Sequence, residues 1–398
     1  MKKLITFLSI CTTVAILALP VAAHNAIAQD PCSAEGKTAL YKTFTDNFKG
    51  DQAKAYDAAK KYLACPATEV DAQQQAIIDY LKKFVGKYED ADKKGKFRAL
   101  LYTDKKYPEA YALGKEMLAA EPDNLRVLID LGSNGYLVAN NPALSAEALE
   151  YAKKALQQLD AGKTVDDWQP LASKDVAVAY LNYTVGALSL DKDPANALKN
   201  LIKAAQFETP LKKSPYTYAF IAGAYETGPY KQQAEEYKRV YFGKDETPES
   251  KLALANINQL VDRMIDGYAR AVALAGSDAA FAQPKAVWND SLTNWYKYRN
   301  NNTTTGMDQL ITSVLSKPLP PEPTPLTSLP ASTPAATPAN TSGTPGNGAA
   351  STASPGTTAP AASNGTANKT TSTGTMNKTT TATKPNGTKS DKPRRNHQ

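Results

Sequence analysis

The feature that most constrains the fold is a helical hydrophobic pattern in residues 107–136. Apolar or small residues recur every three to four positions, first from Tyr107 to Leu118 and then from Leu125 onward. This is the spacing of one face of an α-helix. Asp123 stands between the two runs, and we expect it to cap the second helix. Two amphipathic helices joined by so short a turn pack antiparallel, and each leaves apolar surface for a neighbouring pair to cover.

The same pattern continues over most of the chain. Expected helices cover residues 33–49, 51–64, 69–88, 91–104, 107–120, 124–140, 143–159, 173–190, 194–207, 215–227, 230–242, 249–275, 285–299 and 306–316. Several begin with a capping residue followed by proline, at 141–142, 193–194, 214–215 and 247–248. Proline at the first helical position loses no hydrogen bond, because that N–H has no partner inside the helix. The sequence therefore predicts an all-α protein.

One of these helices recurs along the chain. Its copies are centred on four alanines, Ala110, Ala148, Ala197 and Ala234, separated by 38, 49 and 37 residues. The longest interval contains an inserted loop with its own tryptophan, Trp168. A recurrence of this length is typical of a helical solenoid in which successive helix pairs stack. An irregular helical bundle without superhelical order is the alternative.

Residues of these repeats resemble the consensus of the tetratricopeptide repeat (TPR) family. One repeat supplies its bulky position, its apolar and small pair, its aromatic and the alanine of its second helix: Tyr218, Ile221, Ala222, Tyr225 and Ala234. Other repeats supply further consensus positions: Ala110, Leu131, Gly132, Ala148 and Ala155. The resemblance is clearest over residues 91–248. It implies a TPR-like α-solenoid of stacked antiparallel helix pairs over residues 29–316, with these side chains packing the repeats.

The two ends of the chain differ from this helical part. Residues 1–28 have the pattern of a cleaved export signal, with two lysines, an apolar run and an Ala-Ile-Ala site. The apolar run is short for a membrane span, and no later stretch could cross a membrane. Residues 317–398 contain no aromatic residue and are rich in proline, threonine and asparagine, so we expect them to be disordered. The mature chain is predicted to be periplasmic or secreted, in a bacterium.

The net charge of +7 is distributed unevenly. It divides into +2 for residues 1–28, −1 for residues 29–316 and +6 for residues 317–398. The helical part lacks the basic excess of a nucleic-acid-binding protein, so no nucleic-acid partner is expected. The cationic tail could instead hold the protein to an anionic envelope or cell-wall polymer.

Two cysteines follow the predicted signal, Cys32 and Cys65. In an oxidising compartment, an isolated pair on neighbouring helices most simply forms one disulfide. Closing that loop stabilises a fold by about 3–4 kcal/mol in the chain-entropy estimate. Two unpaired thiols are the alternative, and a redox role is disfavoured because there is no C-x-x-C motif.

The helical part offers little for catalysis. The two histidines, His24 and His397, lie in the signal and the tail, so histidine-dependent nucleophilic catalysis and histidine-containing metal sites are not expected. Two Gly-Lys-Thr triplets lack the earlier glycine of a phosphate-binding loop. Asp262 and Asp266 are one helical turn apart, but Arg270 is placed to pair with Asp266. We expect no enzyme, cofactor or metal.

The sequence therefore favours a non-enzymatic scaffold that binds a peptide or protein partner on the solenoid surface. An envelope-structural or glycan-binding protein is the second interpretation, because Trp288 and Trp295 share one helix face with Tyr296 beside them. Those rings could equally seal the last repeat as part of its core. A carboxylate-dependent glycan hydrolase is the third interpretation.

Overall fold

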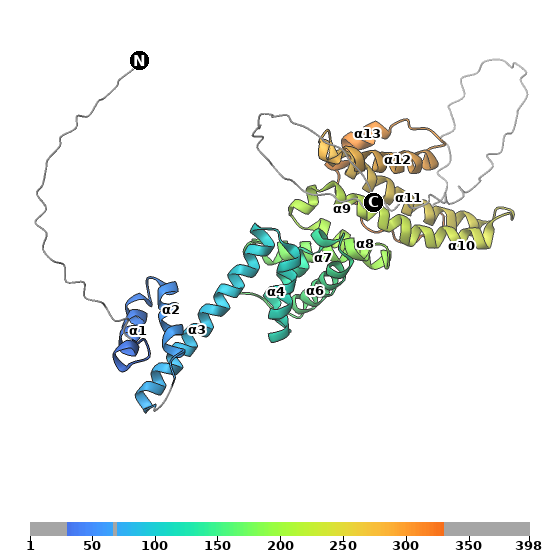
Figure 1. Cartoon of the computed structure of the whole chain (residues 1–398). Helices are drawn as coiled ribbons and strands as arrows, with labels where there is room; N and C mark the ends of the chain where they lie inside the picture. Colours follow the sequence, from blue (N-terminus) through green and yellow to red (C-terminus); the bar gives the residue numbers. More distant parts are fainter. Residues whose placement is uncertain (1–29, 67–69, 330–398) are drawn as a thin grey trace, which may run out of the picture. The chain divides into compact units, whose positions relative to one another are not determined.

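The computed structural model describes residues 30–66 and 70–329, in which every regular element is a helix (Figure 1). The all-α prediction is therefore confirmed for these residues. The predicted signal peptide and residues 330–398 of the predicted tail lie outside the described part. The chain divides into two compact units, with the boundary between Thr103 and Asp104, where the sequence predicts one domain over residues 29–316.

The first unit contains three α-helices and a π-helical turn: α1 (Ala34–Asn47), α2 (Gln52–Leu63), α3 (Ala72–Arg98) and η1 (Ala99–Thr103). Helix α2 packs on α1 and on α3. Phe44 of α1 is buried at their centre, where the ring of Phe84 meets it edge-on at 5.0 Å. The break predicted between residues 88 and 91 is wrong. Glu89 and Asp90 continue the helix, since this stretch holds neither a proline nor a capping glycine.

The second unit begins with α4 (Tyr107–Ala120), α5 (Leu125–Ser133), η2 (Gly135–Val138), α6 (Pro142–Asp160), α7 (Lys174–Ser189), α8 (Pro194–Gln206), η3 (Pro210–Lys213) and α9 (Pro215–Tyr225). It continues with η4 (Glu226–Tyr230), α10 (Lys231–Tyr241), α11 (Pro248–Ala275), η5 (Ala279–Phe281), α12 (Ala282–Arg299), α13 (Met307–Ser313) and η6 (Val314–Ser316). From α5 to α9 each helix packs on the next, and α5 also contacts α7. These packed helix pairs are compatible with a helical repeat fold.

The predicted helix starts are largely observed. Asn141, Asp193 and Thr247 each accept a hydrogen bond in their side chain from the amide three residues later, directly before the proline-started helices α6, α8 and α11. Helix α5 is capped by Asn124 and not, as predicted, by Asp123. The Asp123 carboxylate instead lies 3.0 Å from the ammonium of Lys154 on α6.

Two glycines, Gly132 in α5 and Gly135 at the start of η2, allow the close approach of α6. A Cβ atom built on Gly132 would lie 2.7 Å from the Cα of Ala152, and one on Gly135 would lie 2.7 Å from the Cβ of Ala148. Real Cβ atoms do not approach other atoms so closely. This close packing explains why two poor helix formers occur here.

Most residues expected to pack the repeats are buried. They are Ala110, Leu131, Gly132, Ala148, Ala155, Ala197, Tyr218, Ile221, Ala222 and Tyr225. Ala234 differs, because it is only half-buried and α10 has no buried residue at all.

The reason for this difference is that α9, η4 and α10 follow one another without a turn. The sequence predicts a helix hairpin around Gly228-Pro229, with Ala234 opening the second helix, and this prediction is wrong. The π turn η4 has a wider ring than an α-helix and contains Pro229, which has no N–H to donate and would clash in a regular turn. The chain therefore continues into α10, and α11 takes the place beside α9 that the hairpin partner was expected to fill.

Helix α11 is the centre of the C-terminal part. It spans 28 residues and packs on α9, α12 and α13 (Figure 1). Residues 317–329, predicted to begin the disordered tail, lie along α11 and make hydrogen bonds with it. No helix in the described ranges 30–66 and 70–329 combines the length and apolarity of a membrane span.

Candidate functional site

Two arginines of α11 hold the start of the proline-rich segment, as we name residues 317–329. The Nη2 of Arg270 donates to the carbonyl oxygen of Pro318 at 2.8 Å. The Nε of Arg263 donates to the carbonyl oxygen of Pro321 at 2.7 Å. Hydrogen bonds from a charged donor are stronger than those between neutral groups. Both arginines therefore bind the main chain of the segment, whatever its side chains are.

Two amides of α11 hold the end of the segment. The Nε2 of Gln259 lies 3.4 Å from the carbonyl oxygen of Thr324. Asn256 makes two bonds to Leu326, donating from Nδ2 to its carbonyl oxygen at 3.2 Å and accepting its N–H on Oδ1 at 2.7 Å. Gln259 also donates to Asn256 Oδ1 at 3.1 Å, which fixes the orientation of that amide. The segment thus runs antiparallel to α11.

The lengths of the two elements show that the segment is extended. The donors at 256, 259, 263 and 270 lie three, four and seven residues apart, so they follow one side of the helix. From residue 270 to residue 256 the helix advances about 21 Å at 1.5 Å per residue. The eight steps from Pro318 to Leu326 cover about 25 Å in polyproline II geometry, whereas an α-helix of that length would cover only about 12 Å. An extended chain therefore matches the spacing of the donors.

The contacts of the segment repeat every three residues. Three of the four accepting carbonyl groups belong to residues 318, 321 and 324, and the fourth belongs to Leu326. Pro320, Pro323 and Leu326 are half-buried, as is Leu319 before them, whereas residues 321, 322, 324 and 325 are exposed. Three residues per turn is the period of the polyproline II helix. Five of the eight residues 318–325 are prolines, which accept hydrogen bonds but cannot donate them. Donors on α11 therefore complement a main chain that offers mainly acceptors.

Arg270 is also held in place by residues outside the segment. Its side chain is only 4% exposed, its Nε lies 2.7 Å from Asp266 Oδ2, and its guanidinium lies over the ring of Tyr218 at 5.7 Å. The predicted Asp266–Arg270 ion pair is confirmed. Asp262 is paired as well, with Arg299 at 2.7 Å. Both carboxylates considered for acid–base chemistry are thus occupied by arginines.

Tyr225 lies close to the same face. It is 2% exposed, and its buried hydroxyl makes no hydrogen bond within the described residues. Burial raises the pKa of Tyr225 to about 12, with the charge of Glu322 in the segment adding to the rise and that of Arg263 opposing it. The tyrosine therefore serves this region as a neutral, largely apolar wall.

The aromatic residues of α12 lie mostly inside the fold. Trp288 is 8% exposed and meets the ring of Tyr216 edge-on at 5.3 Å. Trp295 is half-buried and packs edge-on against Tyr230 at 4.8 Å. The hydroxyl of Tyr296 donates to the carbonyl oxygen of Thr305 at 2.9 Å. Trp288 therefore presents little ring surface to a sugar, and these contacts favour the interpretation of α12 as part of the core.

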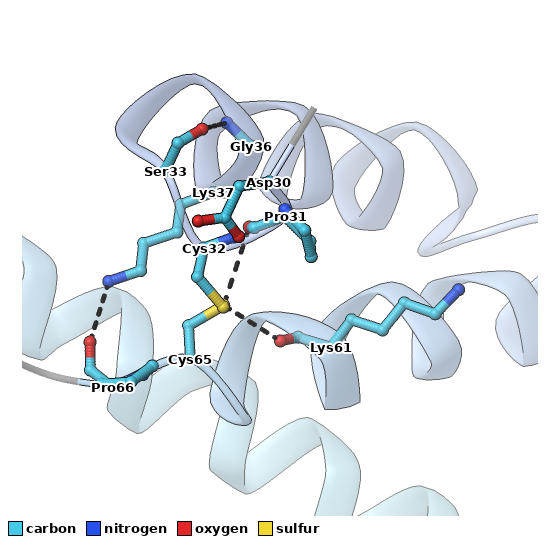
Figure 2. The surroundings of a disulfide bond; sticks show 9 residues. All are labelled: Asp30, Pro31, Cys32, Ser33, Gly36, Lys37, Lys61, Cys65 and Pro66. Carbon is cyan, nitrogen blue, oxygen red and sulfur yellow. Dashed lines mark hydrogen bonds between the residues drawn. A yellow bond between two sulfur atoms is a disulfide. The ribbon is translucent and has the colours of Figure 1, made fainter. Parts of the chain in front are cut away.

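The first unit contains the disulfide that the sequence predicts. Cys32 and Cys65 are bonded, with their Cα atoms 5.2 Å apart (Figure 2). The ammonium of Lys37 donates to the carbonyl oxygen of Pro66 at 3.2 Å, which adds a second link between the same chain ends. The bond joins the start of α1 to the end of α2. Its environment is that of a structural crosslink, and such bonds fit an oxidising compartment.

The described residues contain no cluster of three histidine, cysteine or carboxylate side chains that could hold a metal ion. The polar row of Asn256, Gln259 and Arg263 was missed in the sequence. A signal for it was present, since these residues share one side of an amphipathic helix and the tail opens with repeated P-x-x-P spacing. Neither pattern identifies the other as its partner.

Comparisons with family models, with curated proteins and with solved structures find no match to this chain. The fold and the site described above are therefore the basis for its function.

Proposed function

We propose that the chain is an exported, non-enzymatic interaction protein that binds an extended segment of a partner protein on α11. The observation that carries this proposal is that four α11 side chains bind main-chain carbonyl groups of the segment, at residues 318, 321, 324 and 326. A helix that binds carbonyl groups every three residues is suited to extended peptides, because affinity comes from the backbone and side-chain pockets add specificity. The TPR-like helix pairs from α5 to α9 form the scaffold beside it.

Export is part of the same proposal. The signal-like residues 1–28 and the Cys32–Cys65 disulfide both support a periplasmic or secreted location. The basic residues beyond 329 would then hold the protein near an anionic envelope polymer and concentrate it where its partner is found.

Photo-crosslinking in cells tests the function. A photoreactive residue replaces Gln259 on the α11 face, and in a matched variant it replaces the exposed Gln232 on α10. We expect one defined envelope protein to crosslink at position 259 and not at position 232, with the crosslink mapped to an extended segment of that protein. Arg263→Glu in the same chain should abolish the adduct.

Two outcomes contradict the proposal. In the first, the same adducts form at positions 259 and 232, which would mean non-specific proximity. In the second, position 259 crosslinks only within its own chain under all conditions of growth.

A further inference from the structure

We propose that the α11 face is a binding site for proline-rich segments of another protein in polyproline II conformation, and that residues 317–327 occupy it as an internal competitor. This inference rests on the proposed function and assigns its ligand class and its regulation. The ligand is defined by backbone chemistry, which the structure shows through the chain's own segment.

The register of the hydrogen bonds matches a polyproline II ligand. Arg270, Arg263 and Gln259 donate to the carbonyl groups of residues 318, 321 and 324, at an interval of three. Only a chain with three residues per turn presents successive carbonyl groups to one side in this way. A polyproline II segment from another protein would meet the same donors.

The burial of side chains within the segment indicates which residue sizes a ligand needs. Pro320, Pro323 and Leu326 are half-buried, whereas Glu322 and Thr324 are exposed. A ligand therefore needs proline-sized residues at the first two of these positions and a larger apolar residue at the third. The exposed positions should tolerate many side chains, which is what allows one face to accept a foreign segment.

Asn256 restricts which residue can bind opposite it. Its Oδ1 accepts the N–H of Leu326 at 2.7 Å, so the residue that binds there cannot be proline. The site thus takes proline at the two earlier half-buried positions, 320 and 323, and forbids it at position 326. This rule separates specific binding from general attraction to proline-rich chains.

The internal segment competes with any partner segment for the α11 face. The segment follows η6 directly, so it is held beside α11 at an effective concentration of about a millimolar or higher. Its main-chain bonds to α11 are few, and of residues 317–327 only Leu319, Pro320, Pro323 and Leu326 are half-buried while the rest are exposed, so it can be displaced. A partner must then outcompete it, and a weak or scarce proline-rich chain would not.

Fluorescence anisotropy on the whole mature chain tests the inference. The released variant carries P320G, P323G and L326G, which remove the side-chain contacts of the internal segment and loosen it. The probe is a labelled peptide with the sequence of residues 317–327. We expect this peptide to bind the released variant at least about tenfold more tightly than the unchanged chain, because the competitor is gone. Adding Arg263→Ala should weaken binding about tenfold.

Three peptides test the ligand class. A peptide with E322A and T324A should bind within about threefold of the original, since only exposed positions change. A peptide with L326P should lose binding, and so should a peptide with P320G and P323G. The inference would be overturned if all peptides bound equally well. It would also be overturned if no peptide bound to a released variant whose melting temperature equals that of the unchanged chain.

If the released variant does not fold, the inference can still be tested on the unchanged chain. Millimolar peptide must then accelerate hydrogen exchange at the amide of Leu326, and no acceleration would overturn the inference. The failures are distinguishable. A partner that crosslinks at position 259 without peptide binding disproves only the ligand class, whereas peptide binding without any partner in the envelope disproves the proposed function.

Discussion

Asn256 and Leu326 form a reciprocal pair of hydrogen bonds across 70 residues of sequence, with N–O distances of 3.2 and 2.7 Å. The side-chain amide of asparagine offers the same donor and acceptor as a peptide group. Asn256 therefore binds the main chain of Leu326 as a neighbouring strand would, although the described residues contain no strand. This pair ends the contact between α11 and the proline-rich segment, and it leads to the first prediction.

Replacing Asn256 with alanine should release the end of the proline-rich segment. Two hydrogen bonds are lost, each worth about 1 kcal/mol, so hydrogen exchange at the Leu326 amide should accelerate about tenfold or more. Mass-spectrometric exchange of the peptide around residue 326 measures this. Asn258→Ala is the matched control, because Asn258 lies on the same helix and has no hydrogen bond to residues 317–329 in the described part. Equal protection in both variants would contradict the assignment.

Gly132→Ala should destabilise the second unit. The added Cβ would meet backbone atoms of Ala152 at 2.7 and 2.8 Å, so α5 and α6 must separate, at a cost of about 1–3 kcal/mol. Gly223→Ala is the control, since a Cβ there meets nothing within 4 Å. That variant should be unchanged or stabilised by up to about 1 kcal/mol. Urea unfolding followed by tryptophan fluorescence compares the two, and a larger loss for Gly223→Ala would contradict the packing.

Reducing the Cys32–Cys65 disulfide should destabilise the first unit. The bond closes a loop with a sequence separation of 33 residues, and releasing it restores entropy to the unfolded chain worth about 3–4 kcal/mol. Hydrogen exchange of α1 and α2 should therefore accelerate at least about a hundredfold in reductant. A variant with both cysteines changed to serine should show the exchange rates of the reduced protein, and reductant should not change them. Unchanged exchange after verified reduction would show that the crosslink adds no stability.

Tyr225→Phe should protect the protein at high pH without changing it near neutrality. The pKa of Tyr225 is raised to about 12, so the unfolded chain, with a pKa near 10, releases this proton first. The stability that Tyr225 contributes is thus present below pH 10 and is lost as the pH rises towards 12. At pH 11 the phenylalanine variant should be more stable than the unchanged chain by about 1.4 kcal/mol.

Urea unfolding at pH 8 and pH 11 measures this difference. The buried hydroxyl has no hydrogen-bond partner in the described residues, so little should be lost at pH 8. A variant that loses as much stability as the unchanged chain between the two pH values would contradict the burial of Tyr225.

Features set by interactions close in sequence could be predicted, whereas features set by distant contacts could not. Thr247-Pro248 predicted the start of α11 because a cap and a first-turn proline act within four residues. The hairpin expected at Gly228-Pro229 was wrong, because a π turn accommodated the proline and α11 supplied the packing partner for α9. Proline lowers the preference for a helix locally, but contacts made elsewhere in the fold outweighed that preference.

The sequence by itself determined the helical class and the cysteine pair, since these depend on local periodicity and residue chemistry. Only the tertiary structure decided where the ordered chain continues after residue 316. Composition alone makes residues 317–329 resemble the rest of the tail, because they bury little apolar area. Their order depends on donors on α11 that lie 48 to 70 residues earlier in the chain. No local pattern joins those donors to that segment, and folding brings them together.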